Sequence, residues 1–162
     1  MAIWKRRKLL EAGVRAPEFQ LGLLTGGETS LHTITAAGPA VCVFFKISCP
    51  VCQFTLPFLE RIHAAGALSV YGISQNGPED TRDFCQRYGV TFPMLLDREE
   101  SGFPVSNAFG ISSVPTIFLV EAAGTVSHVI EGWRKSEVEW LSGKAGVRTI
   151  RQEDHVPEWK AG

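Results

Sequence analysis

The sequence predicts an α/β fold in which helices cover both faces of a mixed central sheet. Short apolar runs rich in β-branched and aromatic residues, such as Ala-Val-Cys-Val-Phe-Phe at 40–45, alternate with longer stretches whose apolar residues recur at helical spacing. Gly and Pro residues separate these stretches, so each run has a defined start and end. The 162 residues suit one domain and show no repeat or low-complexity tract. We therefore expect a single domain over residues 1–162.

The predicted elements follow one another without a long linker. We expect a hairpin over 17–34 that turns at Gly26-Gly27, a strand over 40–45, a helix from Pro50 to Gly66, a strand over 68–74, a helix over 77–90 and a short strand over 92–97. A loop with a short helix over 101–111 should follow, then two strands over 115–132 around a turn, a helix over 135–146 and a polar tail over 146–162.

Composition and charge narrow the functional classes. Hydrophobic residues make up 44% and charged residues 20% of the chain, which is the balance of a globular protein in water. The net charge of -1 gives no reason to expect nucleic acid or an acidic membrane surface as a partner. No apolar run is long enough to span a bilayer.

Two cysteines separated by two residues, Cys49 and Cys52, are the strongest chemical signal. A zinc site usually needs a second Cys or His pair, but the other cysteines stand alone and the four histidines are scattered. A structural crosslink would close so small a ring that it would constrain the unfolded chain little. A redox-active dithiol is therefore the favoured interpretation, and we expect neither a metal nor another cofactor.

The flanking sequence places this pair where a buried strand gives way to a helix. Pro50 suits the first turn of a helix, and Pro57 should kink the same helix further on. At a helix start, unpaired backbone N–H groups and the helix dipole favour an anion, so Cys49 should be stabilised as a thiolate. Cys52 lies one turn further in and should be less exposed. The pattern predicts an attacking thiol and a resolving thiol, with Lys46 either adding positive charge or simply solvated.

These features together resemble the thioredoxin fold. The later Gly-Ile-Ser-Ser-Val-Pro-Thr motif matches a family motif whose proline is cis and packs against the dithiol, which implies this role for Pro115. The hairpin near the N-terminus and the inserted strand–helix segment over 74–110 resemble the redoxin branch, with its TlpA/ResA-like reductases and its AhpC/TSA-type peroxiredoxin relatives. The resemblance covers residues 13–145.

The resemblance implies a thiol–disulfide oxidoreductase that reduces protein disulfides and receives electrons from another redox protein. It implies Cys49, Cys52 and Pro115 as catalytic residues. The expected substrate-binding residues are Pro50, Val51, Val114, Thr116 and Trp133. We expect a monomer or a weak dimer. For Trp133, core packing is the favoured alternative to a role in substrate binding. Core packing is also the favoured interpretation of Cys42, and a core or partly buried position that of Cys85.

Departures from the thioredoxin pattern keep two alternatives open. Ser48 stands where thioredoxins carry Trp, and Val43 stands where they carry a buried Asp, so Cys52 has no obvious base. A peroxiredoxin-like thiol peroxidase with an antioxidant role is one alternative, although its peroxidatic Cys follows a Thr by three residues and here Lys46 holds that place before Cys49. A non-enzymatic binding module with an idle dithiol is the other.

The first residues bear on the cellular compartment. The start Met-Ala-Ile-Trp-Lys-Arg-Arg is basic, as in a signal peptide, but the apolar core of about 7–15 residues and the small-residue cleavage site are missing. The sequence therefore predicts a cytoplasmic protein, or a periplasmic one if a leader has been removed.

Overall fold

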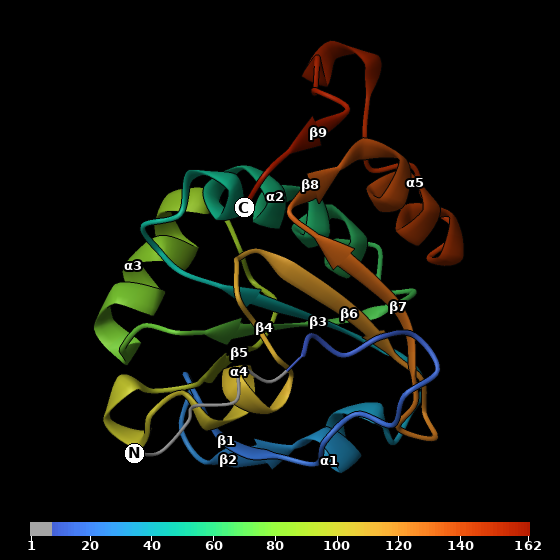
Figure 1. The fold of residues 1–162 in the computed structure, drawn as a ribbon. Helices are drawn as coiled ribbons and strands as arrows, with labels where there is room; N and C mark the ends of the chain where they lie inside the picture. The colour runs from blue at the N-terminus through green and yellow to red at the C-terminus, as the bar shows by residue number, and fades with distance from the viewer. Residues whose placement is uncertain (1–7) are drawn as a thin grey trace.

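A seven-stranded mixed sheet runs through the computed structural model, which describes residues 8–162 (Figure 1). The strand order is β2-β1-β5-β4-β3-β6-β7, and β8 and β9 form a separate two-stranded sheet. The strands are β1 (Gln20–Leu23), β2 (Glu28–Ser30), β3 (Ala40–Phe45), β4 (Ser69–Ser74), β5 (Met94–Leu96), β6 (Thr116–Val120), β7 (Val126–Glu131), β8 (Trp133–Arg134) and β9 (Trp159–Lys160). The helices are α1 (Leu31–Thr35), α2 (Pro50–Ala64), α3 (Pro78–Tyr88), α4 (Pro104–Ala108) and α5 (Lys135–Lys144), with 3-10 turns at η1 (Glu99–Ser101) and η2 (Gln152–Asp154).

The central strand β3 divides the core into two layers. It pairs in parallel with β4 and antiparallel with β6, and all six of its residues are buried. Because successive side chains of a strand point to opposite faces, Val41, Val43 and Phe45 pack toward α2, α3 and α5, while the other three pack toward α1 and α4. Figure 1 shows these two helical layers on either side of the sheet. The predicted mixed sheet with helices on both faces is confirmed.

The N-terminal hairpin joins the sheet through β5. Strand β1 pairs antiparallel with β2 on one side and with β5 on the other, where Leu23 lies opposite Leu95. Gly26 and Gly27 both have positive φ, as the predicted turn requires. The edge of the sheet is therefore completed by two segments that lie far apart in the sequence.

The sequence pattern does not predict helix α1. The pattern assigns residues 31–34 to the end of the hairpin, but Ser30 acts as an N-cap whose hydroxyl accepts a hydrogen bond from the Thr33 N–H at 3.1 Å. Leu31 and Ile34 are buried against the sheet, so five residues suffice for a helix here because packing stabilises it.

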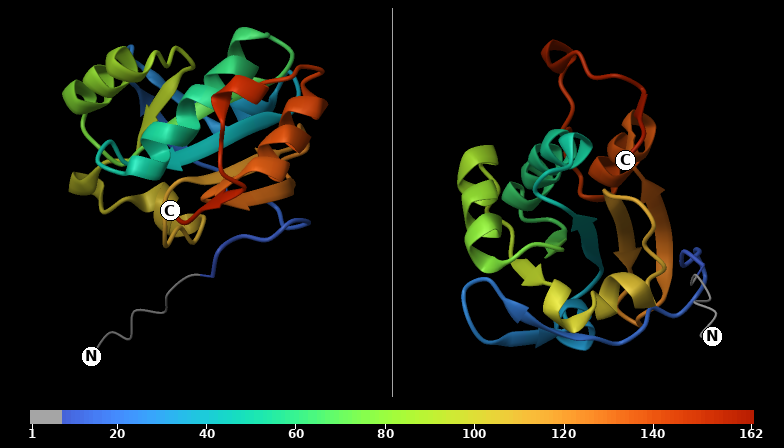
Figure 2. Two further views of the ribbon diagram at one scale, coloured as in Figure 1. Left: turned by 90° about the horizontal axis from the view of Figure 1, so that it is seen from above. Right: turned by 60° about the vertical axis from the view of Figure 1, so that its left-hand side comes forward.

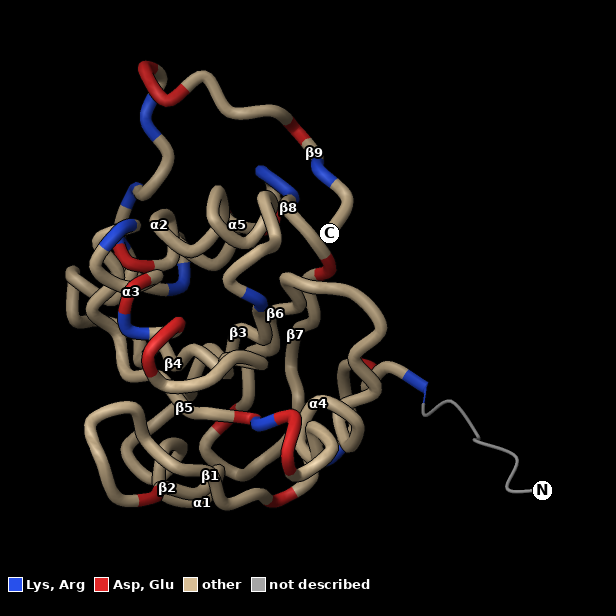
Figure 3. Tube along the Cα trace, turned by 90° about the vertical axis from the view of Figure 1, so that its left-hand side faces the viewer, with Lys and Arg blue, Asp and Glu red and all other residues tan. Residues whose placement is uncertain are grey.

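Residues 147–162, here called the C-terminal segment, fold back onto the rest of the chain. Figures 1 and 2 show this segment leaving α5, looping outward and returning past β8 toward α2. Its charged residues are of both signs, as Figure 3 shows, and Arg61 of α2 binds one of them, Asp154, with N–O distances of 2.8 and 3.1 Å. Ile150 and Val156 pack against Phe58 and Trp133. The predicted polar tail is thus held by apolar contacts as well as by an ion pair.

Residues 1–7, the basic start of the chain on which the prediction of the cellular compartment depends, lie outside the residues that the structure describes.

Candidate functional site

Cys49 occupies the N-cap position of α2. Its Sγ accepts a hydrogen bond from the Cys52 N–H at 3.2 Å, and its carbonyl oxygen accepts the Gln53 N–H at 3.0 Å. A sulfur that receives a backbone N–H at a helix start is well placed to carry negative charge. Cys49 is half-buried, whereas Cys52 is fully buried, and both are free thiols. The predicted asymmetry between the two thiols is present in the structure.

The short loop before Cys49 is fixed by two side chains that the sequence analysis did not identify. The amide oxygen of Asn76 accepts the Ile47 N–H at 3.0 Å, and the Gln53 side-chain amide donates to the Ile47 carbonyl at 2.9 Å. These bonds join the loop to the segment after β4 and to α2. Cys49 is therefore held from both sides of the loop that carries it.

The environment of Cys52 disfavours its thiolate. Burial is the largest cause that raises the pKa of Cys52, and the hydrogen bond with Cys49 raises it further. Val43, which stands where thioredoxins carry an acid, belongs to the same apolar cluster as Cys52. Cys52 therefore remains protonated until its surroundings change.

The loop that ends in Pro115 lies against the dithiol. The Val114–Pro115 bond is cis, as predicted, and the Cys49 thiol donates to the Val114 carbonyl oxygen at an Sγ–O distance of 3.4 Å. The hydroxyl of Thr116 donates to the Ser113 carbonyl at 2.9 Å and closes the turn. Two motifs separated by 65 residues thus meet at the Cys49 sulfur.

A small hollow lies beside this contact. It has a volume of about 110 Å³ and is lined by Lys46, Gln75 and residues 111–114. Pro50 is exposed and Val51 and Val114 are half-buried, so these three residues lie at the surface around Cys49. A substrate approaching Cys49 would meet them first.

Two residues that we expected to contact substrate are buried instead. Thr116 is 1% exposed and Trp133 is 0% exposed, so a substrate cannot contact either side chain in this conformation, and the burial of Trp133 fits the core-packing interpretation. Thr116 points its hydroxyl into its own turn. Trp133 packs edge-on against Phe54 at a centroid distance of 4.8 Å and against Phe58 at 5.0 Å. Both side chains therefore lie beneath the surface that surrounds Cys49.

The remaining cysteines are less suited to reaction. Cys42 is fully buried in β3, and burial raises its pKa to about 12. Cys85 in α3 is half-buried, and its pKa is raised to about 11, first by burial and then by the charge of Glu60. Since the thiolate is the reactive form, both should react more slowly than Cys49.

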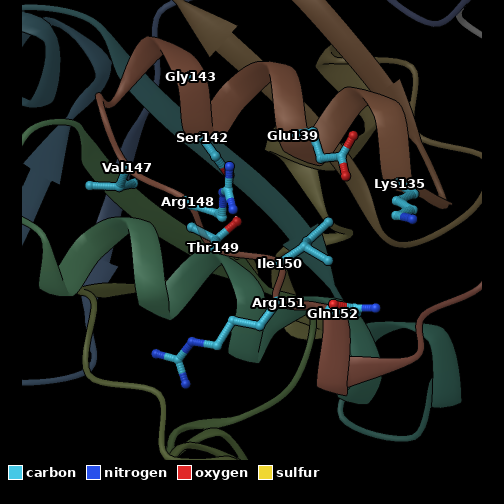
Figure 4. Close-up of a pocket in the computed structure, with 10 residues that line it drawn as sticks. All are labelled: Lys135, Glu139, Ser142, Gly143, Val147, Arg148, Thr149, Ile150, Arg151 and Gln152. Atoms are coloured by element: carbon cyan, nitrogen blue, oxygen red, sulfur yellow. The ribbon is translucent and has the colours of Figure 1, made fainter.

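A larger hollow of about 560 Å³ lies apart from the dithiol, between α5 and the C-terminal segment (Figure 4). Its lining includes Lys135, Glu139, Arg148 and Arg151 but neither cysteine of the pair. Within residues 8–162, no three His, Cys, Asp or Glu side chains are grouped so that they could hold a metal ion. No helix in the described part of the chain is long and apolar enough to cross a membrane.

Strand β3, the Cys49–Cys52 pair at the start of α2 and the cis-proline loop beside it are arranged as in the thioredoxin fold. Together with relatives named thiol-disulfide oxidoreductases, this arrangement places the protein in that class of enzyme. The chain belongs to the AhpC/TSA family, whose model matches residues 12–129. It is 30% identical over 130 residues to the thiol-disulfide oxidoreductase ResA of Halalkalibacterium halodurans, covering 78% of this chain and 72% of the relative. It is 29% identical over 129 residues to ResA of Geobacillus thermodenitrificans, covering 77% and 72%.

Solved structures share the fold. The thioredoxin domain of a thiol-disulfide oxidoreductase from Bacteroides vulgatus matches with a TM-score of 0.73 at 20% identity, over 86% of this chain and 99% of that one. The peroxidoxin BcpB of Mycobacterium tuberculosis matches with a TM-score of 0.70 at 21% identity, over 88% and 99%. Reductases and a peroxidoxin thus share this architecture, so the residues around the cysteine must decide between the two chemistries.

Proposed function

We propose that the protein reduces disulfide bonds in protein substrates, with Cys49 as the nucleophile and Cys52 as the resolving thiol. The observation that carries this proposal is the asymmetry of the pair. Cys49 is half-exposed and accepts a backbone N–H at a helix start, while Cys52 is fully buried with a raised pKa. One thiol can reach a partner and the other can reach only its neighbour.

The reaction takes two exchange steps. The Cys49 thiolate attacks one sulfur of the substrate disulfide, and the other substrate sulfur leaves as a thiolate that takes up a proton. Cys52 then loses its proton and attacks the Cys49 sulfur, which releases the second substrate thiol. The substrate gains two electrons and two protons, and the protein is left with a Cys49–Cys52 disulfide.

The Val114 backbone is the proposed docking edge for the substrate chain. Its carbonyl oxygen lies 3.4 Å from the Cys49 sulfur, so a peptide strand placed against it would bring its own cysteine to the nucleophile. Pro50 and Val51 would form the opposite side of the contact. A second redox protein would restore the dithiol by the reverse exchange, because that chemistry passes two electrons directly between cysteine pairs.

Serine variants test the assignment, with Cys85→Ser as the matched control. Cys49→Ser should abolish reduction of insulin, and Cys52→Ser should accumulate a mixed disulfide that excess dithiothreitol releases. Cys85→Ser should keep wild-type turnover. Iodoacetamide should alkylate Cys49 faster than Cys85 in the wild-type protein. Full turnover by Cys52→Ser, or equal alkylation rates at Cys49 and Cys85, would show that the roles are assigned wrongly.

A further inference from the structure

The last eight residues, 155–162, run alongside the proposed docking edge. Strand β9 pairs antiparallel with β8, so that Lys160 lies opposite Trp133 and Trp159 lies opposite Arg134. The Lys135 N–H donates to the Glu158 carbonyl at 2.9 Å, and the Trp133 indole N–H donates to the Pro157 carbonyl at 2.7 Å. Residues 157–160 are thus held to β8 and to the start of α5 by backbone pairing and by two further hydrogen bonds.

Two glycines allow this strand to lie close to its neighbours. A side-chain carbon on Gly132 would lie 2.5 Å from the Lys160 carbonyl oxygen and 3.2 Å from the Gly162 nitrogen. A side-chain carbon on Gly162 would overlap the Val114 carbonyl oxygen and lie 2.8 Å from the carbonyl carbon. Backbone therefore packs directly on backbone at Val114, the residue whose oxygen contacts the Cys49 sulfur.

Aromatic side chains lie beneath the strand. The buried indole of Trp133 lies edge-on to Phe54, and the Lys160 ammonium lies 5.3 Å from the centre of the Phe54 ring. Phe54 belongs to α2, two residues after Cys52. The strand therefore covers β8 and an aromatic residue near the start of α2, and its last residue reaches Val114.

The strand is held only lightly at its end. Residues 158–162 are all exposed, and β8 and β9 share only two residue pairs. The firmer anchor lies upstream, where Arg61 binds Asp154. A segment with few buried apolar contacts opens at a low free-energy cost, so the end can leave while the anchor stays in place.

We propose that residues 155–162 occupy the groove in which a substrate strand binds, so that the groove fits an extended peptide with a small residue beside Val114. This inference rests on the proposed function. A substrate strand on the Val114 carbonyl and Gly162 in its present place cannot coexist, because both need the same space. The bound end therefore competes with protein substrates, while a small disulfide needs only the Cys49 sulfur.

A leucine at Gly162 tests this competition. Gly162→Leu adds a side chain where it would overlap Val114, and Ala161→Leu adds the same side chain one residue earlier, at an exposed position on the opposite side of the strand. Apparent affinity scales with the fraction of open groove, so Gly162→Leu should raise kcat/KM for insulin by about three- to tenfold over Ala161→Leu. Reduction of hydroxyethyl disulfide should be the same in both variants.

Two further measurements accompany the kinetics. Hydrogen exchange at the Lys135 N–H should be faster in Gly162→Leu, because that proton bonds to Glu158 only while the strand is seated. A synthetic peptide with the sequence of residues 155–162 should inhibit insulin reduction by Gly162→Leu and leave hydroxyethyl disulfide reduction unchanged.

The outcomes separate the two proposals. If both disulfides are reduced but the two leucine variants have equal insulin kcat/KM, the groove inference is overturned. If neither disulfide is reduced by the wild-type protein, the proposed function fails, and the groove is then judged by peptide binding alone. Tighter binding of the peptide by Gly162→Leu than by Ala161→Leu would support the groove, and equal binding would refute it.

Discussion

Asp97 provides a test of how the Val114 loop is positioned. Its carboxylate is fully buried at the end of β5 and accepts the Val105 N–H at 3.1 Å and the Ser106 N–H at 2.7 Å. These are the first-turn amides of α4, whose own N-cap residue, Phe103, makes no side-chain cap. Helix α4 leads directly into the loop that carries Val114, so Asp97 fixes the start of that path.

Asp97→Ala should leave both buried N–H groups without a partner. Each unsatisfied buried donor costs about 1–3 kcal/mol. Local relaxation offsets part of the combined cost of the two donors, so we expect the free energy of unfolding to fall by about 2–4 kcal/mol. For a chain of this length the melting temperature should fall by about 5–15 °C. Asp97→Asn keeps one acceptor oxygen and should lose about half as much free energy.

Urea unfolding followed by tryptophan fluorescence measures this loss as a shift of the midpoint. Asp83→Ala is the matched control, because Asp83 is exposed on α3 and its removal should change the free energy of unfolding by no more than about 0.5 kcal/mol. If Asp97→Ala had the same midpoint and slope as Asp83→Ala, the two hydrogen bonds would not anchor α4, and the reasoning would fail.

Three further predictions concern chemistry. Because burial raises the pKa of Cys52, its thiolate fraction should grow about tenfold per pH unit. The rate at which Cys52 resolves the mixed disulfide should therefore keep rising up to about pH 8.5. A quenched-flow profile that levels off near pH 7 would contradict this prediction. Hydrogen peroxide should oxidise the protein slowly, like an ordinary thiol, because the residue three before Cys49 is Lys46 rather than the Thr of a peroxidatic site. Millisecond formation of sulfenic acid at Cys49 in stopped flow would favour a peroxidase. The hydrogen bond with Arg61 is the largest cause that lowers the pKa of Asp154 from 3.8 to about 2. The contact with Arg61 is therefore fully present above about pH 4 and should be lost as the pH falls toward 2. Tryptophan fluorescence should show this transition in the wild-type protein and not in Asp154→Asn.

The sequence was sufficient where local patterns determine the structure. Strand β3 is a continuous apolar run, and α2 begins at a proline after Cys49, so both could be assigned from the residues themselves. The contact between Cys49 and Val114 joins residues 65 apart and was expected only through the resemblance of the Val-Pro-Thr motif. The spacing of apolar residues predicts helices and strands, but it does not predict that the loop of Val114 will contact the start of α2.

The missed features depend on distant parts of the chain. Asn76 and Asp97 follow strands, where polar residues usually belong to turns, and only their partners at Ile47 and Val105 reveal a structural role. Strand β9 has two residues, too few for a detectable alternation, and it forms because β8 offers it an edge. Trp133 follows a glycine at the end of a predicted strand, so the sequence leaves both a binding role and core packing open, and only the returning chain shows that Trp133 is covered.

The pairing of β1 with β5 has a consequence for synthesis of the chain. Leu23 lies opposite Leu95, so the hairpin cannot dock until 72 further residues have been made. At about 5–20 residues per second this takes about 4–14 s, during which Leu21 and Leu23 have no sheet to cover them. Strand β1 is thus made well before the strand that shelters it, and during this interval a chaperone would have reason to bind the nascent chain.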